Sequence, residues 1–519
     1  MRSYDAIVLG AGHNGLVAGA LLARAGYQTL IVEAASVAGG AARTVEFAPG
    51  FKVSHVAHLL THLDGRVVDQ LGLVSHGLEL LPNDLATIAL SLDERPLRID
   101  GHTLAGVVKR EEQVAWQALY DRLLRFAATL RPFMHEVPPE LGRSTKTSGF
   151  KLARLGLAIR NLGRDEMREF LRLVLMPIAD VLEDELSDPR LMGAVAFDAT
   201  LGTHLGPRSP GSVLTLLYRL SGEIAGHLGR VAMAKGGMGA LTASLARAAT
   251  AAGAEIRLLS KVEQIIVDSD RVTGLRLASG EEFITPLVVS AANPRTTLLD
   301  MVGPRYLGTG TIRRVNAIRM RGNAAKLHLA LLGSPNWRGL APASENSRLI
   351  IAPSIDAIEG AFNAAKYGEA SADPVMEIVV PTLSDPSLAP QGKHVLSAIV
   401  QYAPYDVKGG WESNRAAFTE TAIGVLERYA PGIRHLIVAA ELVTPYDLES
   451  RYLMLGGHWH HGEMSVDQMF MLRPFQEAAQ YRTSVDGLFL AGAGSHPGGN
   501  IMGLSAMNCV AAIRKGRGK

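Results

Sequence analysis

The first hydrophobic pattern in the chain is a short apolar run that stops at a glycine. Residues 6–9 are all apolar, which predicts a buried parallel strand. Apolar residues then recur at helical spacing over residues 16–23, and Gly26 follows as a helix end. A second apolar run at residues 29–32 ends in Glu33. This order predicts a βαβ unit with two parallel strands.

The turn between this first strand and the helix has the spacing of a dinucleotide-binding loop. Gly10 permits the tight turn, Gly12 lets a pyrophosphate approach the backbone, and Gly15 lets the helix pack closely on the strand. The start of the helix adds free N–H groups for phosphates. Glu33 follows Gly15 by 18 residues, near the offset of about 20 for an acid that binds ribose hydroxyls. A glycine turn without a ligand is the alternative. The predicted turn comprises Gly10, Gly12, His13, Asn14 and Gly15.

Beyond this unit the hydrophobic pattern predicts alternating blocks of helices and strands. From about residue 59 to residue 230 the periodicity is mostly helical, and residues 312–448 mix strands and helices. A further helix is expected within residues 235–253, and small residues predict a last helix at 504–513. Short apolar runs predict strands or hairpin arms at 254–258, 262–267, 272–277, 282–285, 287–290 and 488–490.

Composition narrows the class of protein. Of 519 residues, 47% are hydrophobic and 20% charged, with a net charge of +2, so we expect a globular chain without a nucleic-acid partner. Cys509 is the single cysteine, which excludes an intrachain disulfide, a catalytic dithiol and a zinc site of several thiolates. No signal peptide and no apolar run of about 18 residues is found, so a cytoplasmic protein without a transmembrane helix is expected.

Two further glycine-rich segments are not needed by a simple NAD-binding domain. Gly39 and Gly40 follow the acid at position 33 closely, where the backbone would pass near a dinucleotide. Residues 487–503 read GLFLAGAGSHPGGNIMG. A flavin needs a second loop of this kind because its pyrophosphate and ribityl chain follow one more backbone turn. The second loop therefore favours FAD over NAD.

In these segments the sequence resembles the phytoene-desaturase-like flavoproteins of the amine-oxidase superfamily. The likeness is carried by residues 487–503, by the VVSAANP segment at 288–294 and by residues 456–474. The last stretch is most similar to the branch that contains pyridine nucleotide-disulphide oxidoreductase domain-containing protein 2 and the phytoene-desaturase-like carotenoid ketolases. The resemblance implies an α/β fold, with a discontinuous Rossmann-type FAD-binding domain and an α+β substrate-binding domain. The implied domains are 1–65, 231–305 and 480–519 for FAD, and 66–230 and 306–479 for the substrate, with a helical, membrane-facing part around 115–190.

The resemblance also implies how the cofactor is held. FAD is expected to be non-covalent, because Cys509 lies inside the last predicted helix, beyond the flavin loop. The backbone near Val262 would meet the adenine. Many members of the superfamily have an arginine directly after the Gly-Gly pair, whereas here Ala41 follows and Arg43 comes two residues later. The expected cofactor-binding residues are Gly10, Gly12, His13, Asn14, Gly15, Glu33, Gly39, Gly40, Ala41, Arg43, Val262, Gly492, Ala493, Gly494, Gly499, Ile501 and Met502.

Polar residues just before the C-terminal motif are the candidates for catalysis. The flavin itself performs hydride transfer, so a protein base is needed only if a proton leaves a neighbouring atom. We expect His460 or Glu463 to transfer that proton, and Asp467 and Gln468 to make hydrogen bonds that orient the loop. A polar turn with a purely structural role is the alternative.

Three histidines near the N-terminus form a second polar group. His55, His58 and His62 are spaced by three and four residues, so they would share one face if this segment were a helix. They lack the accompanying carboxylates or thiolates of a known zinc pattern, and no metal is expected. We expect them to line the substrate cavity or its entrance, or to pack in the core.

The combined interpretation is an FAD-dependent oxidoreductase that dehydrogenates or oxidises a largely apolar, polyene- or isoprenoid-like substrate. The expected electron acceptor is oxygen or a quinone. One alternative is a flavin amine oxidase. Another is a flavin-binding, membrane-associated scaffold with little turnover, because the basic segment 143–168 would suit an anionic membrane surface. A core helix with a solvated basic face explains the same segment, and a homo-oligomer is left open.

Overall fold

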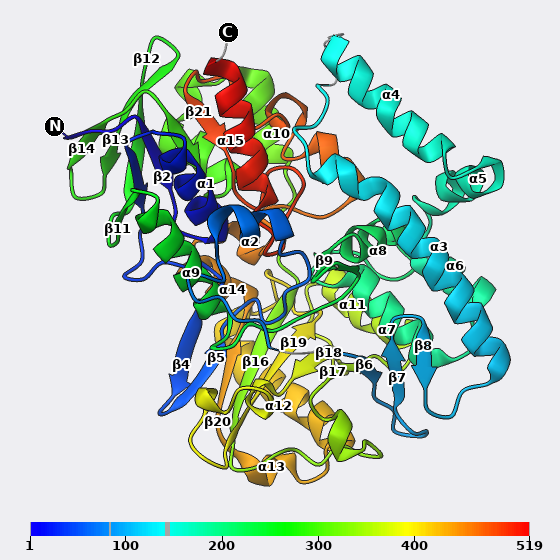
Figure 1. The fold of residues 1–519 in the computed structure, drawn as a ribbon. Helices are drawn as coiled ribbons and strands as arrows, with labels where there is room; N and C mark the ends of the chain where they lie inside the picture. The colour runs from blue at the N-terminus through cyan, green and yellow to red at the C-terminus, as the bar shows by residue number, and fades with distance from the viewer. Residues whose placement is uncertain (1, 82–84, 141–145, 518–519) are drawn as a thin grey trace.

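The glycine turn lies on a parallel sheet at one end of the molecule (Figure 1). The computed structural model describes residues 2–81, 85–140 and 146–517. Five parallel strands pair in the order β11-β3-β2-β15-β21. Because they come from three distant parts of the chain, they confirm the discontinuous Rossmann-type fold. Their bounds are β2 Ala6–Leu9, β3 Thr29–Val32, β11 Glu255–Arg257, β15 Val288–Ser290 and β21 Leu488–Leu490.

Both faces of this Rossmann sheet are buried, which explains why its strands are continuous apolar runs. Ala6, Val8 and Ile31 pack on one face against three helices. Ile7 and Leu9 pack on the other face against a four-stranded sheet of order β1-β14-β13-β12. The three helices are α1 His13–Arg24, α9 Met238–Ala251 and α15 Leu504–Arg517, and the strands are β1 Arg2–Ser3, β12 Val262–Asp268, β13 Arg271–Leu277 and β14 Glu282–Ile284.

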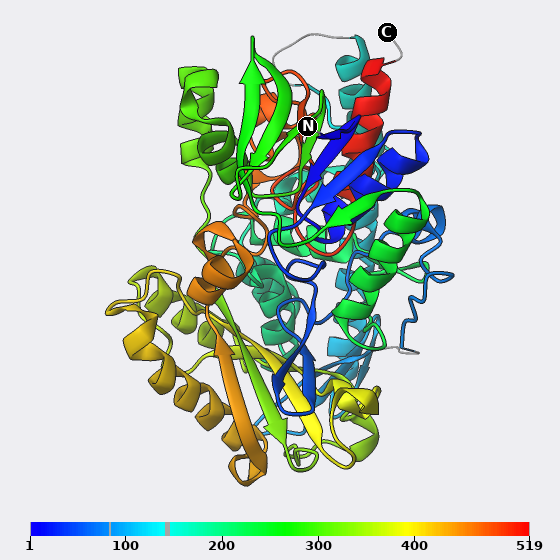
Figure 2. The same cartoon turned by 90° about the vertical axis from the view of Figure 1, so that its left-hand side faces the viewer.

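An eight-stranded sheet of order β20-β16-β19-β18-β17-β6-β7-β8 lies below the Rossmann sheet in both views (Figures 1 and 2). One of its faces packs against helices α12 and α13 through a core that contains Leu327, Leu329 and Phe418. The strands are β6 Thr87–Ala89, β7 Leu97–Asp100, β8 Thr103–Ala105, β16 Ala324–Leu331, β17 Arg348–Ile351, β18 Val375–Val379, β19 His394–Gln401 and β20 Ile437–Val443, and the helices are α12 Gly410–Tyr429 and α13 Ile433–Leu436.

Strands β6, β7 and β8 lie inside the region whose periodicity is mostly helical, and the hydrophobic pattern did not predict them. Each has only three or four residues, and β7 and β8 are partly exposed. Strands this short carry too few alternating positions to establish a period of two. They form because β6 pairs in parallel with β17, a partner far along the chain.

The rest of that region is helical, as the pattern predicts. Helices α3, α6, α7, α8 and α11 share one apolar core, which includes Leu123, Phe126 and Phe197. Helix α4 extends away from the body of the molecule (Figure 1), whereas α5 packs on this core through Phe170 and Leu173. The helix bounds are α2 Gly65–Leu71, α3 Arg110–Met134, α4 Lys146–Arg160, α5 Arg164–Leu173, α6 Ile178–Glu185, α7 Pro189–Thr200, α8 Ser212–Leu220, α10 Thr309–Ala317, α11 Ile355–Lys366 and α14 Pro445–Tyr452. Two separate hairpins complete the fold. One pairs β4 Thr44–Ala48 with β5 Phe51–Ser54, and the other pairs β9 Glu223–Ile224 with β10 His227–Leu228.

The predicted domain boundaries stay a prediction. Val67 and Leu71 of α2 pack in the core of the Rossmann sheet, although the predicted first segment ends at residue 65. Phe51 and Val53 of β5 pack instead with Ala330 of the eight-stranded sheet. Among the described residues, no helix combines the length and the apolarity needed to cross a bilayer.

Candidate functional site

The glycine turn leaves space where a ligand would pass and none where the helix packs. A Cβ atom on Gly15 would lie 1.8 Å from the Gly10 carbonyl oxygen, so only glycine fits there. A Cβ atom on Gly12 would meet no atom within 4 Å. Gly12 also precedes α1 without a side-chain cap, so the first N–H groups of this helix are available to an anion.

The carboxylate of Glu33 is fixed beside this turn. It accepts hydrogen bonds from the backbone N–H groups of Ala11 at 2.7 Å and Ala35 at 2.9 Å. A carboxylate offers about four acceptor positions, so Glu33 keeps capacity for a further donor. Glu33 and Val262 both line the cavity described below, as the sequence predicts for an adenosine-binding end.

Gly39 and Gly40 pass directly beside the turn. The N–H of Gly39 donates to the carbonyl of Ala11 at 2.8 Å. A Cβ atom on Gly40 would lie 3.2 Å from the Cα of Gly12, and φ of Gly40 is 55°. Gly40 and Ala41 line the cavity. The second glycine pair therefore brings another backbone segment to the same wall.

The glycines of the C-terminal motif serve backbone packing in several places. A Cβ atom on Gly492 would lie 2.6 Å from the carbonyl oxygen of Ala291. One on Gly499 would lie 1.9 Å from Nδ1 of His460. These close approaches bring the loop after β21 against both β15 and the polar stretch that contains His460. Residues of this motif that reach the cavity are Ala493, Asn500 and Ile501.

Arg473 holds the polar stretch and the C-terminal motif together. Its side chain is fully buried and donates hydrogen bonds to the backbone carbonyls of His460, Gly462, Glu463, Gln468 and Ala493. Burial lowers the pKa of Arg473 to about 10, so the group stays charged at neutral pH. Arg473 lies in the family-like stretch 456–474, but the sequence pattern predicts no role for it.

The two candidates for proton transfer occupy different positions. His460 lines the cavity, and its Nδ1 is buried without a hydrogen-bond partner among the described residues. Burial, with nearby His458 and Arg473, holds the pKa of His460 well below 6.5, so the imidazole is neutral. Glu463 is buried and does not line the cavity. Burial raises the pKa of Glu463, but its hydrogen bonds outweigh this and keep the carboxyl ionised.

Asp467 and Gln468 lie away from the cavity wall. The Asp467 side chain is 61% exposed and forms an ion pair with Arg319 at 2.7 Å. Gln468 accepts a hydrogen bond from the Arg319 N–H at 2.9 Å and donates to its carbonyl oxygen at 3.3 Å. Both residues bind Arg319, in the segment that follows α10, and so hold the polar stretch against this segment. Neither residue lines the cavity.

The three N-terminal histidines do not share a helix face, and this expectation is corrected. Their segment follows strand β5 and lies outside the α-helices, because its hydrogen bonds go to other elements. His55 contacts Glu441 at 3.0 Å, and His58 contacts Glu377 at 2.8 Å. His62 donates to the Tyr218 carbonyl at 2.8 Å. The histidines therefore have separate partners, and His58 lines the cavity.

One cavity of about 700 Å³ joins these segments, within the range of about 300–1,000 Å³ that is usual for ligand sites. Its wall includes the glycine turn, Glu33 and Val262 on the Rossmann side, and Asp198, Arg219 and Glu377 on the other side. The predicted cofactor residues that line it are Gly10, Gly12, His13, Asn14, Gly15, Glu33, Gly40, Ala41, Val262, Ala493 and Ile501.

Six predicted cofactor residues are absent from this wall. Arg43 places its guanidinium 4.6 Å from the ring centre of Tyr452. Met502 is fully buried in the helical core. The six residues are Gly39, Arg43, Gly492, Gly494, Gly499 and Met502.

Buried neutral histidines give the fold a dependence on pH. Burial lowers the pKa of His62 from 6.5 to about 4. Between pH 6.5 and 4 the unfolded chain binds a proton at this position and the folded chain does not, so stability falls as pH falls. We expect His62→Gln to flatten this slope by up to about 1.4 kcal/mol per pH unit. Urea unfolding at several pH values measures it. An unchanged slope, or equal flattening in the exposed control His227→Gln, would contradict the assignment.

Comparison with known proteins gives one consistent family. Residues 15–503 match the family described as flavin containing amine oxidoreductase. The chain is 32% identical to pyridine nucleotide-disulfide oxidoreductase domain-containing protein 2 of Rattus norvegicus over 537 residues, which covers 98% of this chain and 92% of the rat protein.

More distant matches agree with this result. The chain is 28% identical to a phytoene desaturase (neurosporene-forming) of Cereibacter sphaeroides over 300 residues, which covers 56% of this chain and 55% of that protein. The crystal structure of an oxidoreductase from Methanosarcina mazei shares the fold with a TM-score of 0.62 and 16% identity, covering 98% of this chain and 99% of that one.

Proposed function

Because the chain belongs to the flavin containing amine oxidoreductase family, we propose that this FAD-dependent oxidoreductase takes a hydride from a C–H bond of a substrate with a large apolar part. The observation that carries the proposal is the single cavity that runs from the glycine turn to the eight-stranded sheet. Its wall beyond the Rossmann side includes Leu201, Ile399, Trp459 and Met464. These side chains suit an apolar substrate and exclude water from it.

The residues of the Rossmann side fit FAD. The open space at Gly12 and the uncapped start of α1 suit a pyrophosphate. His13 Nε2 and Asn14 Oδ1 line the cavity and are buried without a hydrogen-bond partner among the described residues, as expected of groups that bind a polar ligand. Glu33 is available to ribose hydroxyls. When bound, the flavin supplies the hydride acceptor.

His460 is the side chain that we propose for proton transfer. It lines the cavity and its ring is neutral, so its unprotonated ring nitrogen can accept a proton from a substrate atom next to the oxidised carbon. Glu463 accepts hydrogen bonds from the N–H groups of Met464 and His204 and lies 3.5 Å from His458. It thus shapes the loop that presents His460, without touching the cavity itself.

The variant His460→Ala is expected to lower kcat by roughly 100-fold or more while FAD stays bound, as is usual when a general acid or base is removed. Reductive half-reaction rates, measured by rapid mixing without oxygen, provide the value. His435→Ala removes an exposed histidine and serves as the control. Equal rates in His460→Ala and the unmodified protein would show that no proton passes through this ring.

The reaction itself is tested by anaerobic titration of the FAD-loaded protein. A C40 polyene, a monocyclic monoterpene and an alkylamine are the probes, and loss of the visible flavin absorbance is the readout. Bleaching by an apolar probe, followed by recovery with oxygen or a quinone, is the expected result. Bleaching by the amine alone would favour amine oxidation, and an unchanged spectrum with every probe would favour a scaffold.

We also propose that helices α4 and α5 contact an anionic membrane. Phe150, Leu157 and Leu171 are exposed by 67%, 54% and 56% on these helices. Exposed basic residues accompany them, including Arg160 and Arg164. Apolar side chains beside cations suit the surface of an anionic bilayer. The predicted basic segment also contains Arg143, which lies outside the described residues.

The membrane proposal predicts sedimentation with vesicles that contain phosphatidylserine and much weaker sedimentation with phosphatidylcholine vesicles. The variant Phe150→Ser with Arg160→Gln and Arg164→Gln is expected to lose most of the binding, since each cation near the surface contributes about 1 kcal/mol. A control variant replaces exposed Arg2 and Lys408 by glutamine. Binding that is insensitive to the first variant, or absent at low salt, would contradict the proposal.

A further inference from the structure

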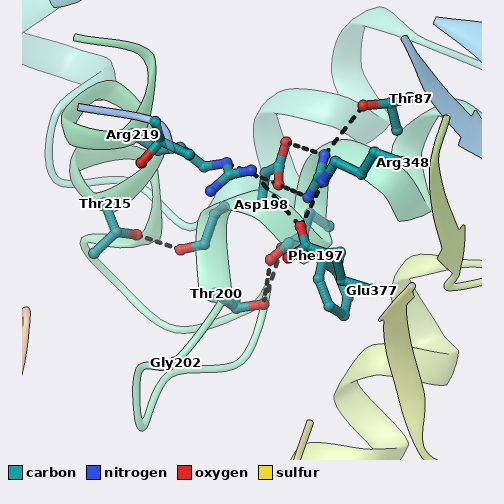
Figure 3. Close-up of polar contacts among 12 residues, drawn as sticks. Thr87, Phe197, Asp198, Thr200, Gly202, Thr215, Arg219, Arg348 and Glu377 are labelled. Carbon is teal, nitrogen blue, oxygen red and sulfur yellow. Dashed lines mark hydrogen bonds and ion pairs between the residues drawn. The ribbon is translucent and has the colours of Figure 1, made fainter. Parts of the chain in front are cut away.

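Four charged side chains from four elements meet at the side of the cavity that is formed by the eight-stranded sheet (Figure 3). Asp198 comes from α7, Arg219 from α8, Arg348 from β17 and Glu377 from β18. Asp198, Arg219 and Glu377 line the cavity, whereas Arg348 lies behind them with 2% of its side chain exposed. Charges buried in this way must be paired or bind a ligand.

Arg348 makes most of its hydrogen bonds within the cluster. It donates to both carboxylate oxygens of Asp198, to Glu377 and to the hydroxyl of Thr87. Figure 3 shows Arg348 and Arg219 on opposite sides of Asp198. These bonds use four of its five N–H donors, so this residue fixes the two carboxylates.

Arg219 is only partly occupied. Its Nε lies 2.9 Å from Asp198 Oδ1, and its Nη2 is 3.8 Å from Glu377 Oε2, beyond hydrogen-bond distance. The two terminal nitrogens have no hydrogen-bond partner in the described part of the chain, and 16% of the side chain is exposed. A guanidinium presents its N–H groups as a planar fork that matches the two oxygens of a carboxylate.

Both carboxylates of the cluster are already paired with nitrogen donors. Asp198 receives N–H groups from both arginines, and Glu377 is bound by Arg348 and by His58 at 2.8 Å. Lys326 supplies a fifth charge, with its Nζ 2.8 Å from Nδ1 of His58.

The positive charges of the two arginines cancel the negative charges of the two carboxylates. The net charge of the cluster therefore depends on whether Lys326 is protonated. Its Nζ contacts His58 and Ser397 and no carboxylate within 4 Å in the described chain. Burial lowers the pKa of Lys326 to about 7, so it is partly charged at neutral pH. The net charge of the cluster is therefore between zero and plus one, which suits a monoanion and disfavours an ammonium group.

We propose that Arg219 binds a carboxylate of the substrate, and that the substrate is an apolar acid. Its carboxylate would lie against the terminal nitrogens of Arg219, and its apolar part would extend along Leu201 and Met464 toward the Rossmann side. This assignment rests on the proposed function for the reaction, since it names the class of substrate for the same cavity. A phosphate dianion would exceed the positive charge that the cluster offers.

The test compares three ligands that differ only in the end group: octanoate, octanamide and octylammonium. Calorimetry with the FAD-loaded protein gives each Kd without the need for turnover. Octanoate is expected to bind about 10-fold to 100-fold more tightly than octanamide, as is usual for a charge-assisted hydrogen bond, and octylammonium most weakly. Equal affinities, or a preference for octylammonium, would overturn the proposal.

Two variants at Arg219 locate the preference. Arg219→Gln should abolish the difference between octanoate and octanamide, and Arg219→Lys should keep part of it because the charge remains. Arg172→Gln, which removes an arginine of an exposed ion pair on α5, is the matched control and should change nothing. An octanoate preference that survives in Arg219→Gln would overturn the assignment. Failure of every probe to reduce the flavin would contradict only the proposed reaction, because the ligand comparison reads binding alone.

Discussion

Replacing Gly12 by alanine is expected to weaken FAD binding by on the order of 100-fold and to leave the flavin-free fold almost unchanged. The backbone of Gly12 has φ −70° and ψ 173°, which alanine adopts without strain. The added Cβ atom would meet no protein atom within 4 Å. Because Gly12 lines the cavity, the methyl group would instead occupy the space that we assign to the pyrophosphate.

Two measurements on this variant separate cofactor binding from packing. FAD affinity follows from fluorescence titration of the flavin-free protein, and the free energy of unfolding follows from urea denaturation, with an expected change below about 1 kcal/mol. Gly308→Ala is the control, because a Cβ atom there also meets no atom within 4 Å and Gly308 is far from the turn in sequence. Undiminished FAD affinity in Gly12→Ala would remove the pyrophosphate from this position.

Replacing Arg473 by methionine is expected to lower the free energy of unfolding by more than about 4 kcal/mol, or to prevent folding. The change leaves five buried backbone carbonyls without their donor, and each unsatisfied group costs about 1–3 kcal/mol. The stretch that carries His460 would also lose its connection to the loop after β21. Urea denaturation measures the loss.

The variant Arg473→Lys also tests whether the hydrogen bonds of Arg473 stabilise the fold, with a smaller change of the side chain. A lysine keeps the charge but has three donors on one nitrogen, so it can reach fewer of the five carbonyls, and we expect an intermediate stability. Arg428→Met removes an exposed arginine that pairs with Asp373, and its cost should stay below about 1 kcal/mol. Similar losses in the Arg473 and Arg428 variants would show that the buried hydrogen bonds contribute little.

Local patterns predicted the Rossmann side of the molecule well. Strands β2, β3, β15 and β21 form at the predicted short apolar runs, and the β13–β14 hairpin forms around Gly280. The reason is that both faces of the four parallel strands are covered, so the apolar signal in each of these runs is strong and does not depend on a distant partner. The glycine spacing of the turn is likewise a local requirement of the backbone.

No local sequence pattern predicted the cluster of charged residues at the cavity. Asp198, Arg219, Arg348 and Glu377 lie far apart in the sequence and on four different elements, so only the fold brings them together. The pairing of β6 with β17 and the buried position of Arg473 depend on the same long-range contacts. The spacing of His55, His58 and His62 was misleading because their segment makes its hydrogen bonds to other elements.

With the proposed role of Arg219, the expected substrate changes from a largely apolar molecule to an apolar molecule with an anionic end. The cavity also has an apolar wall, which includes Leu201 and Met464. The polar end is set by residues that no local pattern identified.

The most direct test of the central claim is the flavin content of the purified chain. After incubation with FAD and removal of the excess, denaturation and absorbance measurement should recover one FAD per chain without a covalent link. A colourless protein that refuses added FAD would contradict the account.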